Sequence, residues 1–77
     1  MTRERYLPSA GQRENELWRL VKGSRELRCV AVYLEIGIDL RLMDADDFHR
    51  TELLKDGPTV QGRAEEWRGK LLHAGWA

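Results

Sequence analysis

The chain has 77 residues, of which 42% are hydrophobic and 34% are charged, and its 13 lysines and arginines balance its 13 aspartates and glutamates. This length and composition allow one domain with one hydrophobic core, and they exclude a largely disordered chain. With no net charge, the molecule has no overall field that would draw it to nucleic acid or to an anionic membrane. Such binding would need a local patch of charge.

The only cysteine is Cys29, so no intrachain disulfide can form. The first residues lack the apolar stretch of a signal peptide, and no run of the chain approaches the roughly 20 apolar residues that span a bilayer. We therefore expect a cytosolic protein that does not enter membranes. A net charge near zero also favours weak self-association.

Residues 1–15 are mainly charged and turn-forming, with Tyr6 and Leu7 as their only sizeable apolar groups. They predict a flexible N-terminal arm, because such a segment has little apolar surface to bury. Residues 16–77 predict a single α+β domain.

From Glu16 onward, apolar and polar residues alternate at every second position, which is the period of a β-strand. We expect strands over 16–22, 26–34 and 38–42, separated by turns that contain Gly23 and Gly37. Residues 48–53 fit a fourth strand less well, because both of its faces are polar apart from the first and last residues. An edge position would suit it, since charges there discourage pairing with a second chain.

Farther along the chain the apolar period changes to that of a helix, which we expect over 58–74. Asp56 or Gly57 is placed to cap its start and Gly75 to end it, with Trp76 packing back on the last turn. The predicted fold is a three- or four-stranded antiparallel β-meander with one C-terminal helix packed on one face, in the order β-β-β-(β)-α. The predicted core is Trp18, Leu20, Leu27, Cys29, Ala31, Ile38, Leu40, Leu42, Phe48, Val60, Ala64, Trp67 and Leu71.

Catalytic and metal-binding patterns are not found in the sequence. Cys29, His49, His73 and the aspartates of 44–47 lack the spacing of metal ligands, and we interpret the aspartates as a solvated turn. No serine lies in a nucleophile elbow, and no glycine-rich loop could hold a phosphate. We therefore expect no enzyme activity, no metal and no cofactor.

Arginines and valines share the sheet face that points away from the predicted core. Arg19, Arg28 and Arg41 could form a basic stripe across three strands, which Asp39 on the same face would partly neutralise. The alternative is a solvated sheet face on which these arginines form cross-strand charge pairs. The valines make this face more apolar than solvent requires and similar in composition to an interface. A partner would cover them, or the arm would do so through Tyr6 and Leu7, or they are simply exposed, as scattered surface apolar residues often are. The candidate binding residues are Arg19, Val21, Arg28, Val30, Val32 and Arg41.

The predicted function is that of a small cytosolic protein-interaction module, such as an accessory, inhibitory or self-associating subunit. It would bind a protein partner or form a homo-oligomer through the outer sheet face and the arm. The alternative is a nucleic-acid-binding module that uses the arginine stripe, although exposed aromatic residues for base stacking are few on this face.

Overall fold

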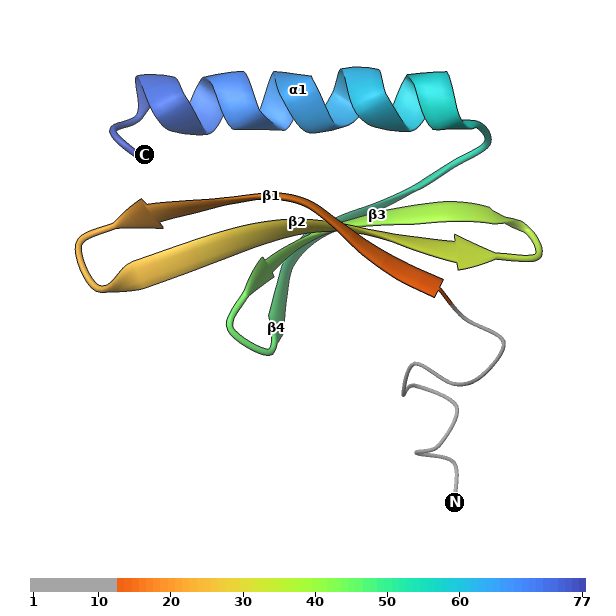
Figure 1. Cartoon of the computed structure of the whole chain (residues 1–77), viewed down its shortest axis with the longest axis horizontal. Coiled ribbons are helices and arrows are strands. Elements are labelled where there is room, and N and C mark those ends of the chain that lie inside the picture. Colours follow the sequence, from red (N-terminus) through yellow and green to blue (C-terminus); the bar gives the residue numbers. More distant parts are fainter. Residues whose placement is uncertain (1–12) are drawn as a thin grey trace.

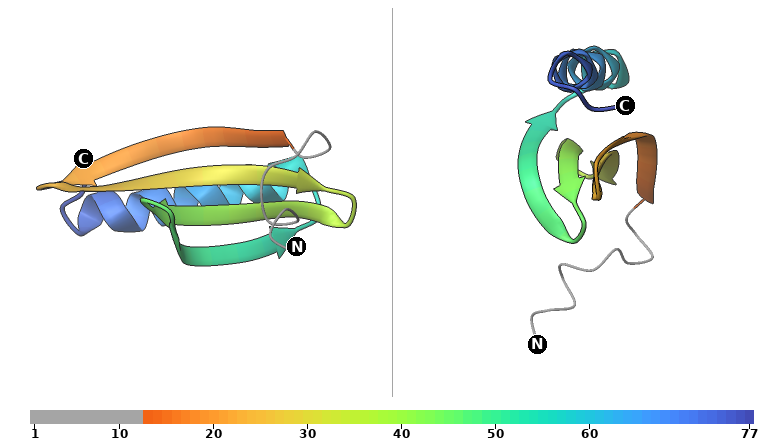
Figure 2. Two further views of the ribbon diagram at one scale, coloured as in Figure 1. Left: turned by 90° about the horizontal axis from the view of Figure 1, so that it is seen from below. Right: turned by 90° about the vertical axis from the view of Figure 1, so that its left-hand side faces the viewer.

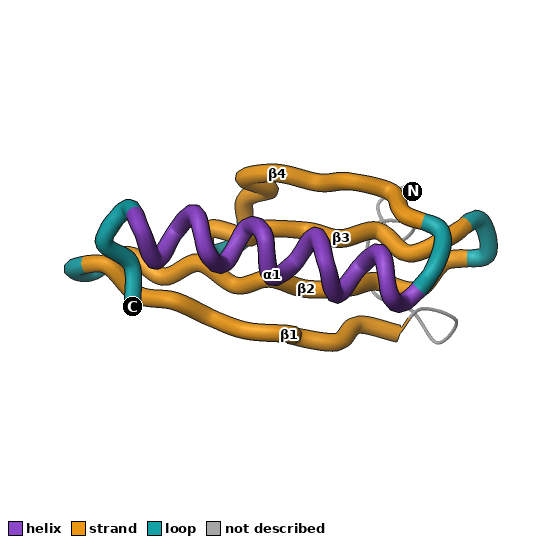
Figure 3. The backbone as a smooth tube through the Cα atoms, turned by 90° about the horizontal axis from the view of Figure 1, so that it is seen from above, coloured by secondary structure: helices purple, strands orange, loops and turns teal. Residues whose placement is uncertain are grey.

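Four strands and one helix make up the part of the chain that the computed structural model describes, residues 13–77. The strands pair antiparallel in the order β1-β2-β3-β4, and α1 runs along one face of the sheet, above β2 and β3 (Figures 1 and 3). This confirms the predicted meander with a helix on one face, and it includes the fourth strand. The elements are β1 (Arg13–Lys22), β2 (Arg25–Leu34), β3 (Gly37–Asp44), β4 (Asp47–Leu54) and α1 (Gly57–His73).

The first strand begins at Arg13, three residues earlier than the sequence pattern predicted, because residues 13–15 continue the pairing with β2. Residues 1–12 lie outside the described part of the chain. The arm, and its contact with the valines through Tyr6 and Leu7, therefore stay predictions.

Turns of two residues join the strands, and the residue that follows the turn between β2 and β3 has to be glycine. Gly37 has a φ of 151°, and a Cβ on it would lie 2.6 Å from the carbonyl oxygen of Leu54. Any other residue would collide with the backbone of β4. Gly23, in the first turn, also has a positive φ of 63°.

Both ends of α1 are capped as the sequence predicts. At the start, the Asp56 carboxylate accepts a hydrogen bond from the Thr59 backbone N–H at 2.8 Å, and hydrogen bonding with Thr59 lowers the pKa of Asp56. At the end, Gly75 has a φ of 102° and donates to the Leu72 carbonyl, while the Trp76 N–H donates to the Leu71 carbonyl. This pair of bonds is a Schellman motif, and it ends the helix at His73.

The C-terminal tail returns to the edge of β1. The Ala77 N–H donates to the Val21 carbonyl at 2.9 Å, and the Lys22 ammonium donates to the Ala74 carbonyl at 2.9 Å. These bonds hold Trp76 in the core, where 8% of its surface is exposed. Trp76 therefore does more than pack on the last turn of its own helix.

The core lies between α1 and the sheet (Figure 2). Most of the predicted core residues lie there, with Trp18 and Leu71 only partly buried at its margin. Trp18 also ties β1 to the helix, since its indole N–H donates to the Ala64 carbonyl at 3.2 Å. The buried cluster consists of Leu20, Leu27, Cys29, Ala31, Ile38, Leu40, Leu42, Leu54, Val60, Ala64, Trp67 and Trp76.

Two β-bulges change which residues face the helix. Leu17 has no partner on β2, and it packs against the core although strict alternation predicts that it points away. In β4 the extra residue is His49, so that Phe48 pairs with Met43 instead of Asp44. This shift moves Phe48 to the other face of the sheet, where 61% of it is exposed. The prediction that Phe48 belongs to the core is wrong for this reason.

Candidate functional site

The sheet face opposite α1, called the outer face here, carries all six predicted binding residues. The register pairs Arg19 with Arg28 and Val30 with Arg41, so these side chains share one face of neighbouring strands. Within residues 13–77, no helix or strand covers this face (Figure 2). The sequence thus placed the six residues together correctly, while their accessibility differs from the prediction.

Two of the valines on the outer face are buried. Val30 is 0% exposed and Val32 is 3% exposed, whereas Val21 is 45% exposed. Both buried valines lie on the inner strand β2, with strands on either side. Their register neighbours include long charged side chains, such as Arg41, whose aliphatic stems cover apolar groups in many proteins. Of these three valines only Val21 is exposed, and a role of the valines in binding stays a prediction.

Each of the three arginines of the outer face is paired with a carboxylate. Arg19 contacts Glu16 at 3.0 Å and Glu26 at 3.1 Å, and its hydrogen bond to Glu16 lowers the pKa of that carboxyl group. Arg28 lies 3.6 Å from the same Glu16. The two arginines of this cluster thus meet two carboxylates.

Arg41 is paired farther along the same face, at 2.8 Å from Asp39. The arginines thus form charge pairs, as the alternative to a basic stripe expected, and the surface has mixed charge. A phosphate group would have to displace carboxylates to reach these arginines, which removes much of the electrostatic attraction that nucleic acid needs.

Exposed apolar residues lie on the outer face where sequence reasoning did not place them. Phe48 is 61% exposed and Leu53 is 51% exposed, and both lie on the edge strand β4. The Arg41 guanidinium lies over the Phe48 ring, 5.1 Å from its centre. No sequence signal marks Phe48 as exposed, because its position depends on the bulge at His49.

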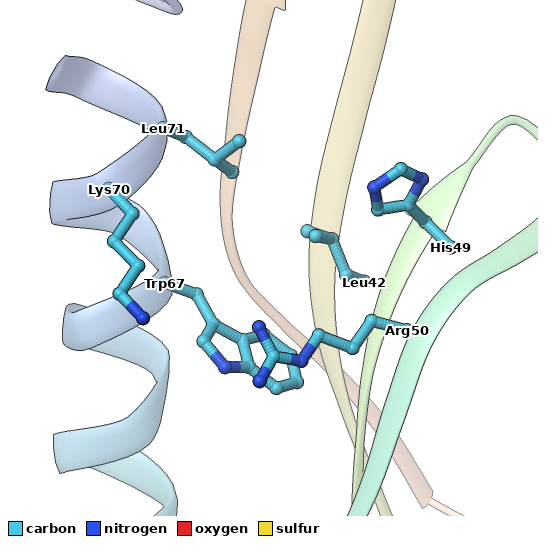
Figure 4. A pocket seen from close by; sticks show the side chains of 6 residues that line it. All are labelled: Leu42, His49, Arg50, Trp67, Lys70 and Leu71. Carbon is cyan, nitrogen blue, oxygen red and sulfur yellow. The ribbon is translucent and has the colours of Figure 1, made fainter. Parts of the chain in front are cut away.

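A pocket lies on the other side of the sheet, between its β4 side and α1, and it was not foreseen. It has a volume of about 190 Å³. Trp67 forms part of its wall, and the Arg50 guanidinium lies over the Trp67 ring, 4.8 Å from its centre (Figure 4). The only signal in the sequence was the helical spacing of the three residues from α1. The lining residues are Leu42, His49, Arg50, Trp67, Lys70 and Leu71.

Metal ligands do not converge in the described part of the chain. Residues 13–77 contain no group of three or more histidine, cysteine or acidic side chains that could hold a metal ion. Cys29 is buried in the core, and burial raises the pKa of its thiol to about 12, so the reactive thiolate is disfavoured. Among these residues, no helix has the length and apolar character needed to cross a membrane.

No protein-family model, curated protein or solved structure matched this chain at a significant level. A function is therefore proposed from the chemistry of the outer face and of the pocket.

Proposed function

We propose that this chain is a cytosolic, non-catalytic protein-interaction module that associates with a second copy of itself through the outer face of the sheet. The observation that supports this most is the exposure of Phe48 and Leu53 on a sheet face that no described element covers. An exposed aromatic ring with arginine beside it is typical of the composition of protein interfaces.

The charges of the outer face favour a second copy as the partner. Three arginines and three carboxylates are paired on it, so the face carries both signs of charge. In a twofold dimer the same patch meets itself, and a patch with both signs can place opposite charges across the interface. The zero net charge of the chain also removes overall repulsion between two copies.

The test is the mass of the protein in solution as a function of its concentration, measured by sedimentation equilibrium. The wild-type protein should shift from monomer toward dimer as concentration rises. Leu53→Glu replaces one of the two exposed apolar side chains of β4 with a charge, and it should keep the protein monomeric with an unchanged fold. Val32 is unsuitable for this purpose, because a glutamate at a position that is 3% exposed would disrupt the sheet itself.

The matched control is Leu72→Glu. Leu72 is 40% exposed and lies on α1, on the opposite side of the sheet from the outer face, so its replacement should leave dimerisation unchanged. A wild-type protein that stays monomeric at every concentration would contradict the proposal, and so would equal effects of the two substitutions.

Nucleic-acid binding is the alternative that the same protein can be tested for. If the arginines hold phosphates, oligonucleotide affinity should fall as salt increases, and loss of Arg41 should flatten that dependence by about one unit of slope. A monomer that binds oligonucleotides in this way at physiological salt would replace the dimer proposal. We expect no such binding, because each of these arginines already has a carboxylate partner.

A further inference from the structure

The pocket between β4 and α1 combines an apolar interior with a cationic rim. Leu42, Leu71 and the Trp67 ring supply apolar walls, whereas His49, Arg50 and Lys70 supply polar groups (Figure 4). These last three residues are exposed, so the pocket opens to solvent on its polar side. Its volume of about 190 Å³ is below the range of drug-sized sites, which start at about 300 Å³, and suits a smaller molecule.

Little negative charge balances this rim. Within residues 13–77, Arg50 has no carboxylate at ion-pair distance, and its guanidinium lies over the Trp67 ring instead. Among the described residues, the only carboxylate paired with Lys70 is Glu66, at 3.8 Å, and Glu66 also contacts Arg63 at 3.3 Å. The neighbouring Glu52 is likewise paired with Arg63. The pocket therefore has positive charge left over for a ligand, unlike the paired arginines of the outer face.

One residue that lines the pocket, Trp67, also carries a buried hydrogen-bond donor that the pocket does not reach. The Trp67 side chain is 2% exposed, and its Nε1–H is buried without an acceptor in the described part of the chain. Buried donors nearly always have a partner, and one without a partner destabilises the folded state. By contrast, the indole N–H of Trp18 has an acceptor in the Ala64 carbonyl.

From the apolar lining of the pocket and the uncompensated positive charge of its rim, we infer that the pocket binds a small organic anion that joins an apolar body to a carboxylate group. The apolar body lies against Leu42, Leu71 and the edge of Trp67, and the carboxylate meets the donors of Arg50 and Lys70. A planar guanidinium and a carboxylate match each other in geometry, which gives Arg50 the main part in recognition. The site lies on the helix side of the sheet, so it is separate from the outer face and does not depend on the proposed dimer.

The test uses phenylacetate as the probe, with phenylacetamide as its uncharged counterpart of the same shape. Binding is followed by the NMR signals of the three tryptophan indole N–H groups, assigned with Trp→Phe variants. Phenylacetate should shift the Trp67 signal in a saturable way, with a Kd in roughly the millimolar range expected for so small a ligand. Phenylacetamide and inorganic phosphate should bind at least about tenfold more weakly, because one lacks the charge and the other the apolar body.

Two variants test the rim, and a third is their control. Arg50→Gln and Lys70→Gln should each weaken phenylacetate binding, with the loss at Arg50 about tenfold or more. Both side chains are exposed, so both variants should stay folded, and only Arg50→Gln should have a lower melting temperature, because it loses the contact with the Trp67 ring. Arg68→Gln removes the same charge from α1 at a residue that pairs with Glu65 and does not line the pocket, and it should have no effect.

Several results would overturn the inference. One is a Trp67 signal that does not respond to phenylacetate, and another is equal binding of the uncharged amide. Equal binding of inorganic phosphate would show a simple anion site without an apolar component. An affinity that is unchanged in Arg50→Gln would remove the residue on which recognition depends.

Discussion

Replacing Trp67 by alanine should remove much of the stability of this domain. A buried tryptophan covers roughly 150–250 Å², which at about 25 cal/mol per Å² corresponds to about 4–6 kcal/mol. The unpaired Nε1–H of Trp67 offsets about 1 kcal/mol or more of this, because its removal relieves a buried donor. We therefore expect a loss of about 3–5 kcal/mol, the range found for large aromatic residues in cores.

This loss is comparable to the whole stability expected for 77 residues, which is about 4–12 kcal/mol at ~0.05–0.15 kcal/mol per residue. A graded series keeps the measurement possible if the alanine variant does not fold. Trp67→Phe should cost within about 1.5 kcal/mol, since most of the apolar surface stays and the unpaired donor is lost. Trp67→Leu should lie between the phenylalanine and alanine variants.

The assay is urea denaturation followed by circular dichroism, with the free energy of unfolding obtained by linear extrapolation. Leu72→Ala is the control, because Leu72 lies on the same helix and is 40% exposed. It should cost clearly less than Trp67→Ala. Equal losses at the two positions would refute the reasoning that the Trp67 side of α1 forms the core.

Two further predictions concern titratable groups. The Cys29 thiol should react with alkylating reagents only when the protein unfolds, and rapid labelling of the folded protein would contradict its burial. The buried neutral thiol stabilises the fold at neutral pH. This contribution should be lost as pH rises from the ordinary thiol pKa of about 8.5 toward the raised pKa of about 12. The lowered pKa of Asp56 means that its contribution is complete above the ordinary aspartate value of about 4 and is lost as acid is added. Asp56→Asn keeps a capping side chain without this titration, so its melting temperature should fall less between neutral and acidic pH than that of the wild type, while Asp56→Ala should be less stable at neutral pH.

The sequence pattern predicts which sheet face a residue lies on, but not whether the residue is covered or paired there. Alternation along β2 and β3 correctly placed Arg28, Val30 and Arg41 on one face. It could not show that Val30 is covered or that Arg41 is paired with Asp39, because burial and ion pairing depend on the neighbouring strands.

The sequence by itself determined the order and type of the elements, because these depend on local periods and end signals. The two-residue period of residues 38–42, the helical spacing around Trp67, and the caps at Asp56 and Gly75 are all read from neighbouring residues. The same local signals predicted a helix on one face of a sheet. They could do so because one apolar stripe and one apolar sheet face must be buried against each other.

Only the tertiary structure decided which residues lie at the surfaces available for binding. One extra residue in β4, His49, turns Phe48 from the core to the outer face, and a pattern of period two contains no sign of such a bulge. The pocket depends on contacts between residues far apart in the chain, since Arg50 meets Trp67 only after β4 and α1 pack together. Trp76 enters the core because the backbone of Ala77 pairs with that of Val21 in β1, and these two residues are far apart in the sequence. These features arise from long-range packing, which no local pattern specifies.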